Sequence, residues 1–118
     1  MKSKSRQYDL EERTLNFLKN VIRLCKNLPK NVVNTELAKQ LIRAAGSVGA
    51  NYREANESIS KKDFNLRIKI SRKEAKESNY WLQGILEANP NSKLEIEPLI
   101  KESLELARIF TAIMNKVK

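Results

Sequence analysis

Apolar side chains recur every three or four residues along this chain, in four separate stretches. The first stretch runs from Leu10 to Leu28, and the second runs from Leu37 to Ile59. This period places the apolar residues on one face of a helix, whereas a half-buried strand would alternate at every second residue. The pattern therefore predicts four amphipathic helices, over residues 8–28, 34–57, 61–89 and 93–117.

The breaks between these stretches carry signals that end or begin helices. Pro29 and Pro90 fall in the first and third breaks, and proline disrupts a continuing helix. The second break holds Ser60, followed three positions later by Asp63, a pair typical of a helix start. Four helices of similar length joined by short loops make antiparallel neighbours. The predicted fold is all-α, an antiparallel up-down-up-down four-helix bundle, with one domain over residues 8–118 and a basic disordered tail over residues 1–7.

Composition removes several classes of function. The 118 residues suit one core and include one cysteine and no histidine. Without histidine, Ser-His and Cys-His catalysis, Glu-x-x-His di-iron sites and nearly all zinc sites are excluded. Cys25 has no partner for an internal disulfide and falls on an apolar face, as a small buried hydrophobe does. We expect no enzymatic activity, no metal and no cofactor. No stretch approaches the roughly 20 apolar residues of a spanning helix, so we expect a cytoplasmic protein with no membrane partner.

Charge adds a candidate partner. The chain carries 23 Lys and Arg against 14 Asp and Glu, a net charge of +9, and residues 1–30 and 61–90 hold most of the excess. Such a surface favours polyanions, although ordinary solubilising charge is the alternative. Five cations of the third helix share an arc of about 100° opposite its core face: Lys62, Lys69, Arg72, Lys73 and Lys76. This arc predicts contacts with nucleic-acid phosphates, and the alternative is a solvated face.

Two further surfaces suggest contacts between helices or subunits. Leu66, Ile70 and Trp81 form a second apolar stripe on the third helix, which predicts an oligomer interface unless that helix is simply central in the bundle. On the second helix, small residues including Gly46 and Gly49 fall on one side and would let another helix approach closely. We expect a homo-oligomer.

A polar seam runs beside the apolar face of the second helix, at Arg43, Ser47, Asn51 and Glu54. We expect it to form a hydrogen-bonded network that reaches Glu74 and Ser78 on the third helix. Arginine can bind a carboxylate through two parallel hydrogen bonds. A structural role, fixing the register of the helices, is the leading interpretation.

Three blocks of sequence resemble one protein family. They are RAAGSVGANYREA over residues 43–55, SKKDF over residues 60–64 and KEAKESNYWL over residues 73–82. In order and spacing they are similar to the 23S rRNA intervening-sequence proteins, from about Leu10 to Met114. The resemblance implies a four-helix bundle that assembles into a ring-like homopentamer. It also implies that these signature residues determine fold and assembly: Arg43, Ser47, Asn51, Tyr52, Glu54, Glu74, Glu77, Ser78 and Trp81.

A related branch of that family comprises the accessory proteins of diversity-generating retroelements, basic pentamers that bind nucleic acid and a reverse transcriptase. We therefore expect a homo-oligomeric bundle that binds RNA or DNA through backbone phosphates. Only Tyr80 and Trp81 are spare for base stacking, so we expect no dependence on base sequence. The alternative is a structural or adaptor protein, such as an accessory subunit of a reverse transcriptase, with no nucleic-acid binding of its own.

Overall fold

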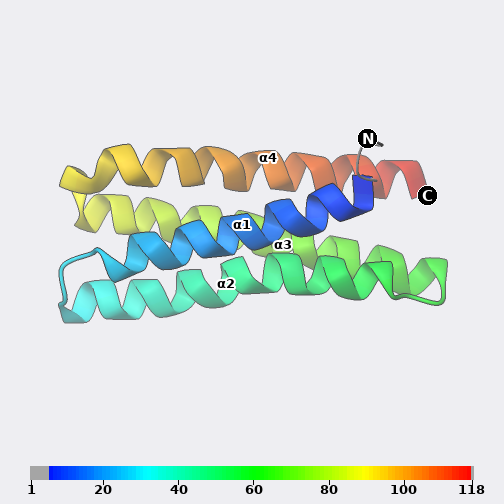
Figure 1. Ribbon diagram of the computed structural model, residues 1–118, viewed down its shortest axis with the longest axis horizontal. Helices are drawn as coiled ribbons and strands as arrows, with labels where there is room; N and C mark the ends of the chain where they lie inside the picture. Colours follow the sequence, from blue (N-terminus) through cyan, green and yellow to red (C-terminus); the bar gives the residue numbers. More distant parts are fainter. Residues whose placement is uncertain (1–5, 118) are drawn as a thin grey trace.

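Four helices make up the computed structural model, which describes residues 6–117 and the side chains of residues 9–116 (Figure 1). The helices are α1 (Arg6–Lys26), α2 (Val32–Asn56), α3 (Lys61–Ala88) and α4 (Lys93–Val117), with a 3-10 turn, η1 (Pro90–Ser92), before α4. There is no strand in this part of the chain, so the predicted all-α bundle is confirmed. Helix α1 begins at Arg6, and residues 1–5 of the predicted tail lie outside the described residues.

Consecutive helices are antiparallel neighbours in a flattened bundle whose Cα atoms extend over 44 × 34 × 19 Å. Helix α3 packs extensively against both α2 and α4, whereas α1 packs on α2 and less extensively on α4. In Figure 1 α1 lies in front and α3 behind. One long face of α3 therefore lies on the side of the bundle away from α1.

Side-chain caps set two of the helix starts. Ser60 is the N-cap of α3, and its Oγ accepts a hydrogen bond from the backbone N–H of Asp63 at 3.0 Å, as the sequence predicts. Asn31 caps α2 in the same way, accepting from the backbone N–H of Asn34 at 2.8 Å. Each cap satisfies a backbone donor that has no partner inside its helix.

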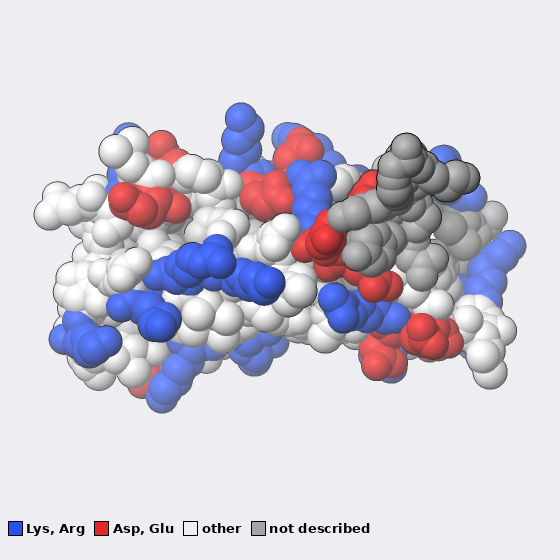
Figure 2. All heavy atoms as spheres, in the orientation of Figure 1, with Lys and Arg blue, Asp and Glu red and all other residues white. Residues whose placement is uncertain are grey.

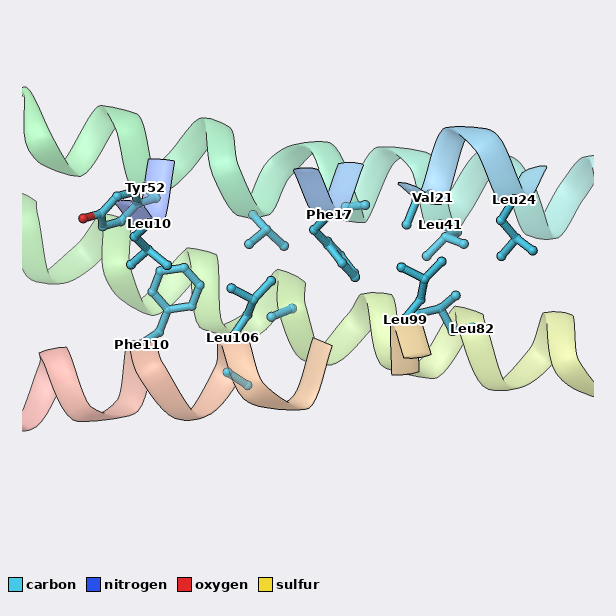
Figure 3. Close-up of a cluster of buried hydrophobic side chains, with 14 of the residues drawn as sticks. Leu10, Phe17, Val21, Leu24, Leu41, Tyr52, Leu82, Leu99, Leu106 and Phe110 are labelled. Carbon is cyan, nitrogen blue, oxygen red and sulfur yellow. The ribbon is translucent and has the colours of Figure 1, made fainter. Parts of the chain in front are cut away.

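The core lies between the four helices and is formed by the predicted apolar faces. Figure 3 shows Phe17 of α1, Leu41 of α2 and Leu106 of α4 pointing into this space. Tyr52 and Phe110 pack with their ring centroids 5.9 Å apart. One predicted core position is wrong: Ile59 is fully exposed, because it lies in the loop after α2 rather than on the helix.

The glycines of α2 face α1 of the same chain. A methyl group added at Gly49 would lie 2.9 Å from Oγ1 of Thr14, and one at Gly46 would have Leu18 as its nearest neighbour, at 3.9 Å. The helix that the small residues admit is therefore α1. This surface gives no support to an interface with a second copy.

Candidate nucleic-acid interface

Four lysines form a row along the outer face of α3. The row consists of Lys62, Lys69, Lys73 and Lys76, separated by seven, four and three residues, so all four share one side of the helix. At a rise of 1.5 Å per residue the row spans about 21 Å. All four side chains are exposed, and none makes an ion pair or hydrogen bond within the described part of the chain. We call these residues the lysine row.

Arg72, the fifth cation of the predicted arc, lies at the edge of this face. Its side chain is half-buried, and Nη1 donates to Oγ1 of Thr111 on α4 at 3.5 Å. The guanidinium is thus directed toward a neighbouring helix. We do not include Arg72 in the lysine row.

Two aromatic rings stand at the C-terminal end of the row. Tyr80 is 67% exposed, and its ring meets that of Trp81 edge to face, with centroids 5.0 Å apart and an angle of 80° between the planes. Trp81 is half-buried against the core, and its Nε1–H donates to Oε2 of Glu77 at 3.2 Å. Of the two predicted stacking residues, Tyr80 alone presents most of its surface to solvent.

The predicted polar seam joins α2 to α3 through Arg43. Its Nη1 donates to Oε1 of Glu74 at 3.5 Å, and its Nη2 forms an ion pair with Oε2 of Glu77. The side chain of Glu74 is 8% exposed and that of Arg43 is 50% exposed. Arg43 therefore bridges two carboxylates, one of them buried, instead of binding one carboxylate through two bonds.

A second part of the seam includes Arg67, which was not among the residues predicted from the sequence. Nδ2 of Asn51 donates to Oγ of Ser47 at 2.9 Å, and Oδ1 of Asn51 accepts from Nη1 of Arg67 on α3 at 3.0 Å. Arg67 stands one heptad before Glu74, and this spacing on the same helical face was the available signal. Arg43 and Arg67 thus tie α2 to α3 at two points.

Besides Trp81, three signature residues lie outside these two groups. The hydroxyl of Ser78 donates to the backbone carbonyl of Glu74 at 2.8 Å, within α3. Glu54 is exposed, and its backbone carbonyl accepts from the hydroxyl of Ser58 at 3.2 Å. Tyr52 is buried in the core. The seam is consequently shorter than the sequence pattern predicts.

The apolar stripe of α3 is only partly free. Leu66 is 54% exposed, whereas Ile70 and Trp81 are half-buried. Trp81 packs against the core of its own chain. Leu66, at the border of the lysine row, is the member of the stripe most available to a partner.

A second group of cations lies on α1, on the opposite side of the bundle. Lys19, Arg23 and Lys26 are exposed and spaced by four and three residues. Figure 2 shows basic side chains gathered over this part of α1, while acidic and basic groups mix toward the other end of the molecule. The positive charge of residues 1–30 was the signal for this group, although the sequence pattern predicts no site on α1.

Cys25, the one cysteine of the chain, is half-buried on α1. Burial raises the pKa of the Cys25 thiol to about 11, so at neutral pH it is protonated and a poor nucleophile. No cluster of three or more Cys, Asp or Glu residues suited to a metal ion occurs over residues 9–116.

Across the described helices, none combines the length and apolar character needed to cross a membrane.

Comparisons with known proteins agree with this architecture. A family model described as 23S rRNA-intervening sequence protein matches residues 6–112. A crystal structure of a protein of unknown function from the S23 ribosomal protein family of Bacteroides thetaiotaomicron VPI-5482 is similar, with a TM-score of 0.78 and 28% sequence identity. The match covers 88% of this chain and 96% of that chain. No curated protein matches the sequence.

Proposed function

From the premise that the chain belongs to the 23S rRNA-intervening sequence protein family, we propose that it is a homo-oligomeric bundle without enzymatic activity that binds RNA or DNA through backbone phosphates. The observation that carries this proposal is the lysine row. Its four ammonium groups face solvent along one side of α3 and have no acidic partner among the described residues. Cations held in this way are available to a polyanion.

The chemistry of lysine supports binding that ignores base sequence. An ammonium group on a flexible stem acts as a point charge, whereas arginine offers a rigid fork for base edges. Contacts to phosphates fix the position of a protein on nucleic acid but carry no direct sequence information. The one arginine of the predicted arc, Arg72, directs its guanidinium group to Thr111 of α4 instead. The row is therefore suited to backbone contacts.

Assembly of several copies would strengthen this binding. The exposed surface of Leu66 beside the lysine row supports a contact between copies. Linked sites raise the effective concentration of the second binding event, so rows that bind weakly one at a time would bind tightly together. We include the homo-oligomer in the proposal for this reason.

The test is a titration with fluorescent single- and double-stranded RNA and DNA at two salt concentrations. In the variant K69Q/K73Q/K76Q, glutamine retains helix propensity close to that of lysine. Each phosphate contact contributes about −0.9 to the log–log salt slope on duplex DNA and about −0.7 on single strands. We expect lower affinity and a flatter salt slope, with unchanged circular dichroism and oligomer mass.

The matched control is K19Q/R23Q/K26Q, which removes the same charge from the opposite face. If both variants weaken binding equally, net charge rather than the lysine row is responsible. If only the α1 variant weakens binding, the interface lies on α1. Either result contradicts the proposal.

A protein-binding adaptor is the second candidate, favoured by apolar side chains at one end of the bundle. Val32 at the start of α2 and Leu94 at the start of α4 are 73% and 85% exposed, and Figure 1 shows both helix starts at the same end. This candidate predicts no measurable affinity for any of the four nucleic acids at low salt. Salt-dependent binding that K69Q/K73Q/K76Q abolishes would exclude it.

A further inference from the structure

We infer that Tyr80 is a base-stacking residue, so that the lysine row takes a single-stranded segment of nucleic acid with at least one unpaired base. This inference rests on the proposed function and adds the class of ligand. It starts from the position of Tyr80, which continues the series Lys69, Lys73, Lys76 at the next helical interval of four residues. The ring therefore shares the face of the lysines.

The ring of Tyr80 is exposed but held in place from one side. Its neighbour Trp81 meets it edge to face at 5.0 Å. Trp81 is in turn fixed by packing against the core and by its hydrogen bond to Glu77. A ring supported in this way loses little freedom when a ligand covers it, which favours binding.

The support continues beneath the surface into the polar seam. Glu77 accepts from the indole N–H of Trp81 and also pairs with Arg43 of α2. Two helices thus contribute to the position of one surface aromatic pair. The indole of Trp81 packs against the core, whereas the ring of Tyr80 is 67% exposed. The ring of Tyr80 therefore adds little to the packing of α3.

An aromatic ring beside cations selects unpaired bases. Bases within a duplex are covered on both faces by their neighbours, whereas a base in a loop or single strand can stack on an aromatic side chain. Stacking is tolerant of sequence because every base has a π face. The combination of Lys73, Lys76 and Tyr80 therefore fits a phosphate backbone with an adjacent unstacked base, in RNA or in DNA.

The test compares Kd values for four labelled probes at one salt concentration. The probes are a 12-nucleotide oligouridine, a 12-nucleotide oligothymidine, an abasic DNA strand with the same number of phosphates, and a 12-base-pair duplex. Loss of one base–aromatic stack is expected to weaken binding about 5- to 150-fold. We expect Y80A to show this loss with oligouridine and oligothymidine only, and Y80F, which keeps the ring, to bind as the parent does. The control L104A removes an exposed apolar side chain from α4.

The outcomes separate the inference from the proposed function. If no probe binds the parent protein, both are wrong. If Y80A leaves the oligonucleotides unaffected, or weakens the abasic strand equally, the inference is wrong while phosphate binding stands. A changed sedimentation mass of Y80A, with unchanged thermal unfolding, would assign the ring to a contact between copies and would also overturn the inference. If Y80A weakens oligouridine and not oligothymidine, or the reverse, the stacked base is assigned to that strand alone.

Discussion

Gly46 and Gly49 are three residues apart on α2, yet they differ in the space available for a methyl group. At Gly49 the added carbon would lie 2.9 Å from Oγ1 and 3.1 Å from Cβ of Thr14, a branched and buried side chain that cannot turn away. At Gly46 the nearest atom is 3.9 Å away. The side chains of α1 therefore lie closer to Gly49 than to Gly46.

Opposite effects on stability are expected at these two glycines. Gly46→Ala should stabilise the protein by up to about 1 kcal/mol, the difference in helix propensity. Gly49→Ala should destabilise it by about 1–2 kcal/mol, because overpacking costs more than the propensity gains. Urea unfolding of both variants checks this. Equal stabilisation by both would show that α1 can move away from α2 without loss.

Arg43 offers a second prediction at the scale of one residue. Arg43→Ala would leave the buried carboxylate of Glu74 without its cation. Because Arg43 is half exposed, we expect a loss of about 1–3 kcal/mol, between the values for surface and fully buried pairs. Thermal unfolding should show a partial recovery in R43A/E74Q, in which the buried charge is also removed. Arg53, exposed on the same helix and unpaired among the described residues, is the control: R53A should be neutral.

A buried pair of amides connects three elements at one end of the bundle. Nδ2 of Asn34 donates to Oδ1 of Asn89 at 3.0 Å, and Nδ2 of Asn89 donates to Oδ1 of Asn34 at 2.8 Å. Asn34 also donates to the backbone carbonyl of Pro29, and Asn89 to that of Ile85. The loop after α1, the first turn of α2 and the end of α3 are therefore held together.

Removal of one amide should affect this whole junction. Asn89→Ala leaves the amide of Asn34 buried with fewer partners, at a cost of about 1–3 kcal/mol. The double variant N34A/N89A should lose less than the sum of the two single variants, because the two residues form one network. Differential scanning calorimetry of the single and double variants measures these losses of stability. Asn91, exposed two residues further on, provides a control that should leave the melting temperature unchanged.

At the scale of elements, the helices and their antiparallel order could be predicted, but the residues that each face meets on another helix could not. Pro29, Pro90 and the Ser60 cap placed the breaks, since these signals act within a few residues of sequence. A helical wheel gives the face of a residue but not the helix that it meets. The ion pair of Arg13 with Glu102, at 2.7 Å, joins residues 89 positions apart, and no local pattern indicates it.

The same limit applies to the candidate site. The lysine row was predictable because it depends on spacing within one helix. The half-burial of Arg72 was not, because it depends on Thr111 of α4. The glycine face of α2 likewise required the position of α1. Spacing along the sequence predicts which residues share a face of one helix, but it does not show which of these faces packs against another helix of the same chain.

The state of assembly is a property of the whole molecule. We expect sedimentation equilibrium to give a mass above the 13.6 kDa of one chain. Leu66→Glu should lower that mass and leave the far-UV circular dichroism unchanged, because a charge on an exposed contact residue opposes association without entering the core. Leu104→Glu, on the exposed side of α4, should retain the parent mass. A parent protein of monomer mass, or equal effects of the two variants, would contradict the predicted interface.

The uneven packing of α1 has a consequence for motion. Within the described residues its backbone approaches α2 and, less extensively, α4, but not α3. Local openings follow such differences in packing, so amide hydrogens of α1 should exchange with solvent through a partial opening of lower free energy than global unfolding. Helix α3 packs against both α2 and α4, so its amide hydrogens should exchange only on global unfolding. Hydrogen–deuterium exchange can measure the free energy of exchange for each helix separately. Uniform exchange free energies would contradict this. A bundle that opens at α1 keeps the outer surface of α3 in its native shape throughout the fluctuation.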